Sequence, residues 1–150
     1  QKQVEQRLAQ RERIGEGDVV ALQLLSSALR AKLRFEIQRP NLCRHPIFRL
    51  WATVDAKSMH HICSQAVDFL SLRPKDDLFA PATSSSSAHV LVSGEMVYKQ
   101  YPDSSPVSEE VSTQVEPGQW FCEAALWVEW THVGRAETCS TCQFLAIDSV

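Results

Sequence analysis

The spacing of apolar residues changes once along this chain, near Phe69. Before that point large apolar residues recur every three or four positions, the spacing of one face of an α-helix. The clearest stripe consists of Leu22, Leu25, Leu29, Leu33 and Ile37. After Phe69 the spacing becomes two, which is typical of strands with one buried face. The pattern predicts helices up to about residue 67 and short antiparallel strands beyond it.

The helical part is expected to contain several segments. Residues 1–13 are strong helix formers with one apolar pair, Val4 and Leu8, and the glycines that follow are expected to end this helix. Residues 19–38 are amphipathic, with a turn at Ser26–Ser27 where Ser27 caps the second helix. Pro40 is expected to stop that helix because proline lacks the N–H that the next turn requires.

Two shorter helices complete this part. A bend at residues 44–46 leads into a helical stretch whose apolar anchors are Ile47, Phe48 and Leu50. Residues 58–67 place Met59, Ile62, Cys63 and Ala66 on one helical face. His60 and His61 are adjacent on this helix, so they point apart and are interpreted as surface or packing residues.

The remaining residues predict short strands at even spacing. Residues 69–82 predict two strands around a turn at 75–77, and the four serines at 84–87 predict a flexible loop. Residues 89–93 and 96–101 predict a hairpin that turns at Gly94. Val111, Thr113 and Val115 are expected on one buried face, and residues 138–147 are expected to form one or two final strands. A brief helix is expected only at about 123–127.

These elements predict an α+β fold, with N-terminal helices followed by an antiparallel roll or barrel. We divide the chain into a helical segment, residues 1–50, and a β-roll, residues 51–150. The residues expected to be buried are Leu29, Leu33, Phe48, Ile62, Phe69, Val90, Val92, Val115, Phe121, Leu126, Phe144 and Ile147.

Charge is distributed unevenly along the 150 residues, whose net charge is −3. Residues 1–50 carry ten Lys/Arg and five Asp/Glu, a net charge of +5, and residues 51–150 carry five and thirteen, a net charge of −8. Two solvated faces of opposite sign explain this most simply, and a basic helical segment that binds an acidic neighbour or anionic lipid is the alternative. The acidic second part argues against a nucleic-acid groove.

Targeting and redox features are sparse. No apolar run approaches the ~18–20 residues that a membrane span needs, and no signal peptide is recognisable. The chain begins without Met, so we expect it to be part of a longer protein. The five cysteines are interpreted as reduced thiols. Cys139 and Cys142 form a CxxC pair without a second ligand pair, so buried small apolar residues are favoured over a metal or redox site.

The candidate chemistry lies in residues 117–136, PGQWFCEAALWVEWTHVGRA. Glu123 and Arg135 stand on either side of about one helical turn. A carboxylate can accept hydrogen bonds from a ribose hydroxyl, and an arginine fork matches a phosphate. The N-terminus of a short helix between them adds backbone donors for an anion. An ordinary loop with a surface Glu and Arg is the alternative.

This stretch resembles the phosphate-binding cassette of cyclic nucleotide-binding domains, F-G-E-[LI]-A-L followed after a spacer by R-[TSA]-A. Cys122 stands where that family usually has Gly, Ala124 stands where it has Leu or Ile, and the spacer before Arg135 is a few residues longer. The resemblance implies cAMP or cGMP as ligand, with no cofactor or metal. Glu123 would accept from the ribose, Arg135 would bind the phosphate, and backbone N–H groups at Ala124, Ala125 and Ala136 would complete the anion site. The implied ligand-binding residues are Phe121, Cys122, Glu123, Ala124, Ala125, Arg135 and Ala136.

A second resemblance covers LLSSALRAKLRFEIQRPNLCRHPIF, which is similar to the end of the C-linker of ether-à-go-go and hyperpolarisation-activated channels. The matching residues are Leu25, Ser26, Leu29, Arg30, Leu33, Pro46 and Phe48, and Lys32 replaces the family's usual acid. The resemblance implies a cytoplasmic domain of a potassium-type channel, homotetrameric in the full protein, that senses cyclic nucleotide or transmits gating. The family's closing helix after the roll is not expected in this chain.

Two further functions remain open. One is a degenerate domain of the same fold that binds no nucleotide and acts through protein contacts, which Cys122 favours. The other is a regulatory subunit of a cyclic nucleotide-dependent kinase, which the C-linker-like start disfavours. An enzyme is not expected, since the sequence offers no base–nucleophile constellation and no Walker-type loop.

Overall fold

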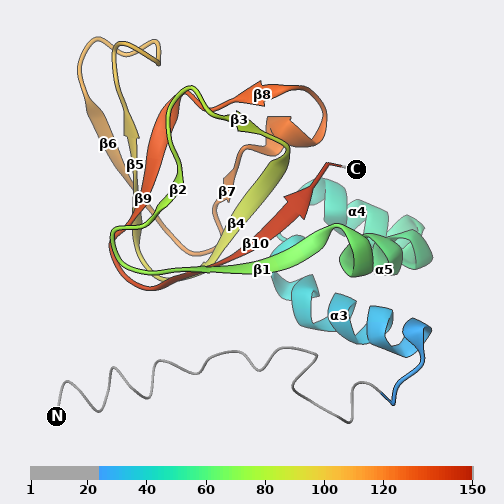
Figure 1. Cartoon of the computed structure of the whole chain (residues 1–150). Helices are drawn as coiled ribbons and strands as arrows, with labels where there is room; N and C mark the ends of the chain where they lie inside the picture. The colour runs from blue at the N-terminus through green and yellow to red at the C-terminus, as the bar shows by residue number, and fades with distance from the viewer. Residues whose placement is uncertain (1–23, 150) are drawn as a thin grey trace, which may run out of the picture.

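The computed structural model describes residues 24–149, in which three helices precede a set of short strands (Figure 1). The helices are α3 (Ser27–Leu42), α4 (Pro46–Val54) and α5 (Ala56–Gln65). A 3₁₀ turn, η2 (Glu123–Leu126), interrupts the strands. The strands are β1 (Val67–Leu72), β2 (Asp77–Phe79), β3 (Ser84–Ser85), β4 (Ser87–Ser93), β5 (Met96–Gln100), β6 (Val111–Val115), β7 (Trp120–Phe121), β8 (Trp130–Thr131), β9 (Gly134–Thr138) and β10 (Cys142–Asp148).

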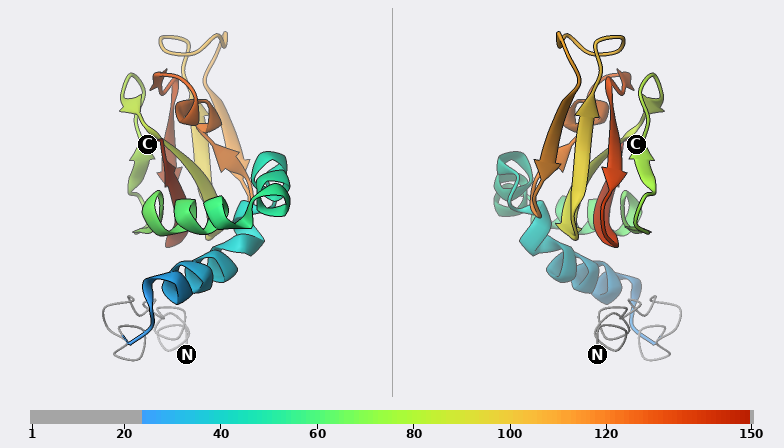
Figure 2. Two further views of the ribbon diagram at one scale, coloured as in Figure 1. Left: turned by 90° about the vertical axis from the view of Figure 1, so that its right-hand side faces the viewer. Right: turned by 90° about the vertical axis from the view of Figure 1, so that its left-hand side faces the viewer.

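The strands form two four-stranded sheets and a two-stranded ribbon. The orders are β1-β10-β4-β7, β2-β9-β5-β6 and β3-β8, with antiparallel pairing throughout. The two larger sheets together form the roll, and the helices lie together at one end of it (Figure 2). The predicted α+β class, with helices first and an antiparallel roll after them, is therefore confirmed.

The predicted hairpin around Gly94 is wrong, because β4 and β5 belong to different sheets. The chain crosses between the sheets at Gly94, and it crosses again between β9 and β10. These two crossings pack together: the Glu95 carbonyl accepts from the Cys139 and Ser140 amides at 2.8 and 3.2 Å. Gly94 has φ +103°, and a Cβ there would lie 2.6 Å from the Thr141 carbonyl oxygen. Glycine is therefore required by both conformation and space.

The helix ends differ slightly from the predicted ones. Ser26, not Ser27, caps α3, since its hydroxyl accepts from the Leu29 amide at 3.3 Å. Pro40 does not stop the helix, which continues to Leu42 with the proline in its last turn. The predicted helix at residues 1–13 and the start of the one at residues 19–38 lie outside the described residues.

Two clusters of buried side chains form the core. One lies between the helices and the first sheet and includes Phe35, Leu42, Phe48, Met59 and Leu145. The other fills the roll and includes Phe79, Leu91, Met96 and Phe144. Burial is confirmed for Phe48, Val90, Val115, Phe144 and Ile147, while Ile62, Val92, Phe121 and Leu126 are partly buried.

Burial of Leu29, Leu33 and Phe69 was predicted wrongly, since they are 54, 37 and 40 % exposed. In α3 the buried residues are Phe35, Gln38 and Leu42, which lie on the opposite side of the helix from the leucines. The helix is apolar on two sides, and periodicity alone does not tell which side meets the roll. Ile47 and Leu50, expected as anchors, are likewise 44 and 65 % exposed.

Two strand predictions also need correction. The serines at 84–87 are not a loop: Ser84 and Ser85 pair with β8, and Ser87 begins β4. In β6, which lies at a sheet edge, Val115 alone is buried, while Val111 and Thr113 are exposed. No helix within residues 24–149 is long and apolar enough to cross a membrane.

Candidate ligand-binding site

The turn that carries the acidic residue of the candidate site begins with an unusual backbone conformation. Cys122 has φ +56° and ψ +30°, the left-handed region, and η2 starts directly after it. Glycine adopts this conformation at little cost, which is a physical reason for the Gly of the family pattern at this position. The Ala125 amide donates to the Cys122 carbonyl at 2.9 Å. One of the three backbone donors proposed for an anion is therefore already bonded within the turn.

Glu123 is bound to the helical segment. Its Oε2 lies 3.2 Å from Nε2 of His45, the residue that precedes α4. The imidazole Nδ1 accepts from the Ile47 amide at 3.3 Å, so the ring proton of a neutral His45 resides on Nε2 and is donated to Glu123. The Glu123 side chain remains 49 % exposed.

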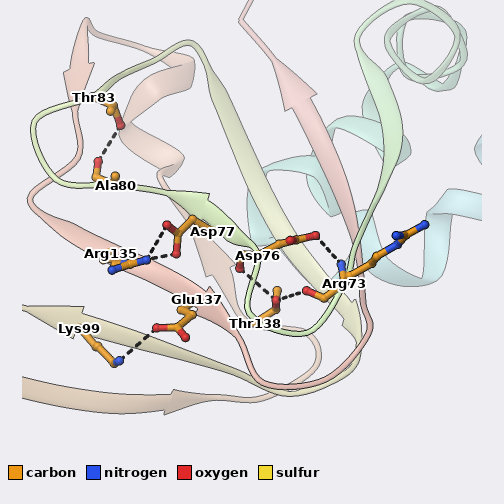
Figure 3. Close-up of polar contacts among 9 residues, drawn as sticks. All are labelled: Arg73, Asp76, Asp77, Ala80, Thr83, Lys99, Arg135, Glu137 and Thr138. Atoms are coloured by element: carbon orange, nitrogen blue, oxygen red, sulfur yellow. Dashed lines mark hydrogen bonds and ion pairs between the residues drawn. The ribbon is translucent and has the colours of Figure 1, made fainter.

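Arg135 is on β9, where buried and less buried residues alternate. Gly134, Ala136 and Thr138 are buried, so Arg135 and Glu137 lie on the outer face of the sheet. The Nε and Nη2 groups of Arg135 donate to Oδ1 and Oδ2 of Asp77, each at 2.8 Å (Figure 3). The hydrogen bonds that Arg135 donates to this carboxylate, and the charge of the carboxylate, raise the pKa of Arg135. A carboxylate thus occupies the fork that the sequence suggested for a phosphate.

The same outer face carries a second ion pair, between Lys99 and Glu137 at 3.1 Å (Figure 3). Both pairs run diagonally across the sheet, because the residues directly opposite each other have like charges. Asp77 is opposite Glu137, and Lys99 is opposite Arg135. Like charges in direct register destabilise a sheet, and the two diagonal bonds relieve that repulsion. The hydrogen bond from Lys99 to Glu137 raises the pKa of Lys99.

Inside the roll, the space next to η2 is filled by aromatic and sulfur-containing side chains. Phe79 stacks on His132 with ring centres 3.9 Å apart, and Tyr98 meets Phe79 edge-on at 6.1 Å. The Sγ of Cys122 lies 3.3 Å from Nδ1 of His132. Burial raises the pKa of Cys122 to about 11 and lowers the pKa of His132. The pair is therefore neutral near pH 7, and Cys122 is a packing residue rather than a nucleophile.

The two charged residues of the cassette-like pattern have separate partners. Within residues 24–149, Glu123 and Arg135 share no hydrogen bond or ion pair; one is bound to His45 and the other to Asp77. Phe121 and Cys122 pack against the roll cluster, and Ala125 and Ala136 are buried. Sequence reasoning missed both partners, because each pairing joins segments far apart in the chain.

The outer side of η2 borders a hollow of about 350 Å³. Residues 125–129 form one wall, and Ser85, Ser86 and Ser149 complete the lining. Of the predicted ligand residues, Ala125 alone lines this hollow, whereas Glu123 and Arg135 do not.

The CxxC pair is divided between core and surface. Cys142 is fully buried, as expected, whereas Cys139 is exposed at the crossing between β9 and β10. All five cysteines are free thiols. In the described part of the chain no three His, Cys, Asp or Glu side chains come together as a metal site would require.

Comparison with known proteins shows the likeness at the level of the fold. No protein-family model matches the chain, and no curated protein matches it in sequence. A cyclic nucleotide-binding-like protein from Brucella abortus is 22 % identical with a TM-score of 0.55, over 67 % of this chain and 83 % of that one. The N-terminal domain of a transcriptional regulator from Streptomyces coelicolor is 21 % identical with a TM-score of 0.57, over 72 % and 71 %.

A third solved structure contains a ligand. The cAMP-bound PfPKA-R structure is 13 % identical to this chain with a TM-score of 0.58, over 79 % of this chain and 38 % of that one. Identities this low establish a common fold and leave the site of each protein to be argued from its own residues. With its helices, its two-sheet roll and the single turn η2 after β7, this chain has the fold of a cyclic nucleotide-binding domain.

Proposed function

We propose that this chain is a cytoplasmic regulatory domain of a voltage-gated or cyclic nucleotide-gated cation channel of the potassium type, homotetrameric in the full protein. Residues 1–50 would connect to the channel as a C-linker-like segment, and residues 51–150 would form the regulatory roll. The C-linker-like residues support this context. They include Ser26, which caps α3, and Phe48, which is buried between the helices and the roll.

Within that context, we propose that the domain acts by protein contacts and not by binding a nucleotide at Arg135. The observation that carries this choice is the two-bond pairing of Arg135 with Asp77. Arg135 points to the outer face of β9 and its fork is occupied by a carboxylate that belongs to the fold. A cyclic phosphate would have to displace that carboxylate and replace two charge-assisted hydrogen bonds.

Cyclic nucleotide sensing is the second candidate. It is favoured by the turn at Cys122, whose left-handed backbone suits the family's glycine, and by Glu123, which is about half exposed. In this version Phe121, Cys122, Glu123, Ala124, Ala125, Arg135 and Ala136 would line the ligand, and Asp77 would swing away. The fold similarity to the cAMP-bound PfPKA-R favours a kinase regulatory subunit, whereas the C-linker-like residues favour the channel.

The experiment that decides between contact and sensing is a calorimetric titration with cAMP and with cGMP up to millimolar concentration. The proteins compared are wild type, Arg135→Ala and Asp77→Ala. Our proposal expects no binding heat for wild type or Arg135→Ala. Asp77→Ala tests whether the Asp77 carboxylate keeps a phosphate away from Arg135. Heat of nucleotide binding that is seen in this variant alone would identify Asp77 as the group that excludes the phosphate.

The opposite outcome is equally clear. Saturable wild-type binding that Arg135→Ala abolishes would overturn the contact proposal and establish nucleotide sensing. Lys99→Ala is the matched control for charge, since Lys99 lies opposite Arg135 on the same face but does not contact Asp77. A loss of binding in Lys99→Ala as large as in Arg135→Ala would indicate a general charge effect.

A further inference from the structure

His45 has two polar contacts in opposite directions from one ring. On one side its Nδ1 accepts the Ile47 amide and so caps the N-terminus of α4. On the other side its Nε2 lies 3.2 Å from Oε2 of Glu123, which is the first residue of η2. The His45 side chain is only 14 % exposed, so its ring has little freedom to turn away. One imidazole therefore joins the helical segment to the turn inside the roll.

The two contacts depend on each other through the position of one proton. A neutral imidazole carries its proton on one nitrogen and accepts at the other. With Glu123 as acceptor at Nε2, the proton stays there and Nδ1 is free to cap α4. Without that acceptor, the form with the proton on Nδ1 becomes populated, and this form cannot accept from the Ile47 amide.

The surrounding contacts hold the same two segments together. The His45 ring meets the Trp120 ring edge-on at 5.0 Å, and Phe48 stacks on Trp120 with centres 5.4 Å apart. Arg44 donates to the Pro117 carbonyl at 3.4 Å. It also lies so close to Gly118 that a Cβ on this glycine would be 1.9 Å from the Arg44 Nη1. Residues 44–48 and 117–123 thus form a continuous contact with His45 at its centre.

We propose that His45 is the coupling residue between the η2 turn and helix α4, with Glu123 as the group that sets its tautomer. A change in the position of Glu123 then alters the first turn of α4, whichever partner or ligand causes it. This inference rests on the proposed regulatory role for its meaning, but the coupling itself is a property of the fold and is measurable without a ligand.

The test is native-state hydrogen exchange at the Ile47 and Phe48 amides, with the imidazole ¹⁵N signals of His45 as a direct report of the tautomer. Glu123→Ala is expected to raise exchange at these amides by about two- to fivefold, the scale of one modest hydrogen bond. It should also move the imidazole signals toward a mixture of tautomers. Glu123→Gln keeps a side-chain acceptor and should leave both readouts near wild type. Glu129→Ala, an exposed acid on the loop after η2, is the matched control.

A second background separates capping from coupling. Asparagine is a good N-cap but is too short to bridge to Glu123, so His45→Asn should retain α4 while breaking the link. In that background Glu123→Ala should have no additional effect on exchange in α4. The coupling proposal is overturned if Glu123→Ala leaves wild-type exchange and tautomer unchanged. It is also overturned if the response persists with Asn at position 45, or if Glu129→Ala produces it. None of these outcomes depends on whether the domain binds nucleotide.

Discussion

The guanidinium of Arg135 faces the carboxylate of Asp77 edge to edge, with two hydrogen bonds of 2.8 Å each. The two residues lie on neighbouring strands but not directly opposite each other, because Asp77 is in register with Glu137. Their pairing is thus a diagonal contact that an outer sheet face with like charges in register makes favourable. Because of this pairing, Arg135, which resembles the family's phosphate-binding arginine, is part of the outer face of the sheet.

The Asp77–Arg135 pair is expected to behave as one unit in stability measurements. Asp77→Ala and Arg135→Ala should each lower the thermal midpoint slightly, because both side chains are partly exposed and water screens the pair. The double variant should be no less stable than the less stable of the two single variants. Raising the salt concentration should shrink both effects. Additive losses in the double variant would contradict the pairing.

Substitutions of Cys122 are expected to change the free energy of unfolding mainly through the backbone conformation at this position, and less through lost side-chain contacts. Cys122→Gly relieves a left-handed conformation but loses the Sγ contact with His132, so the free energy of unfolding should change by less than about 1 kcal/mol. Cys122→Val places a β-branched residue at φ +56° and should destabilise by about 1–3 kcal/mol. Urea unfolding measures both, and Cys122→Ala serves as the control that keeps a Cβ. Equal losses for Gly and Val would argue against this account.

Phe144 and Leu29 are expected to differ sharply, although the sequence pattern placed both in the core. Phe144 is fully buried in the roll, and truncation to Ala should cost about 3–5 kcal/mol. Leu29 is 54 % exposed on α3, so Leu29→Ala should change stability by no more than about 0.5 kcal/mol. Denaturant midpoints for the two variants give the comparison. A large loss for Leu29→Ala would mean that its face of α3 is covered in solution.

His89 is expected to make the domain less stable in mild acid. Burial in β4 and the neighbouring His132 lower the pKa of His89 to about 4, although Asp148 acts in the opposite direction. An unfolded histidine takes up its proton near pH 6.5, so between these values the unfolded chain binds more protons than the folded one. The free energy of unfolding should have its full value above about pH 6.5 and should fall by about 2–3 kcal/mol as the pH drops toward 4.

The measurement for His89 is the urea midpoint across this pH range in wild type and in His89→Gln. The glutamine variant should lose most of the dependence between pH 6.5 and 4, because it has no proton to gain. Among residues 24–149, the Nδ1 of His89 has no hydrogen-bond partner, so the glutamine replaces a group that the described fold leaves unbonded. A profile as steep in His89→Gln as in wild type would place the titrating group elsewhere, with His132 as the next candidate.

Some features of the molecule follow from local patterns in the sequence. The change from helical to alternating spacing near Phe69 predicted the order of helices and strands, because that spacing is a property of the backbone itself. The brief turn after Phe121 and the helix that begins at Pro46 followed from local residues in the same way. The sequence predicted a turn at Gly94. It did not predict that the chain crosses there from one sheet to the other, since strand pairing depends on residues far apart.

By itself, the sequence determined the α+β class, since helices and strands depend on spacing within short segments. Only the tertiary structure decided which side of α3 meets the roll, and which partners Glu123 and Arg135 take. His45 is 78 positions from Glu123 and Asp77 is 58 from Arg135, and no local pattern records such pairings. A charged side chain binds whichever complementary hydrogen-bonding group the folded chain brings within reach. Here the fold supplied a histidine and an aspartate where the sequence suggested a ribose and a phosphate.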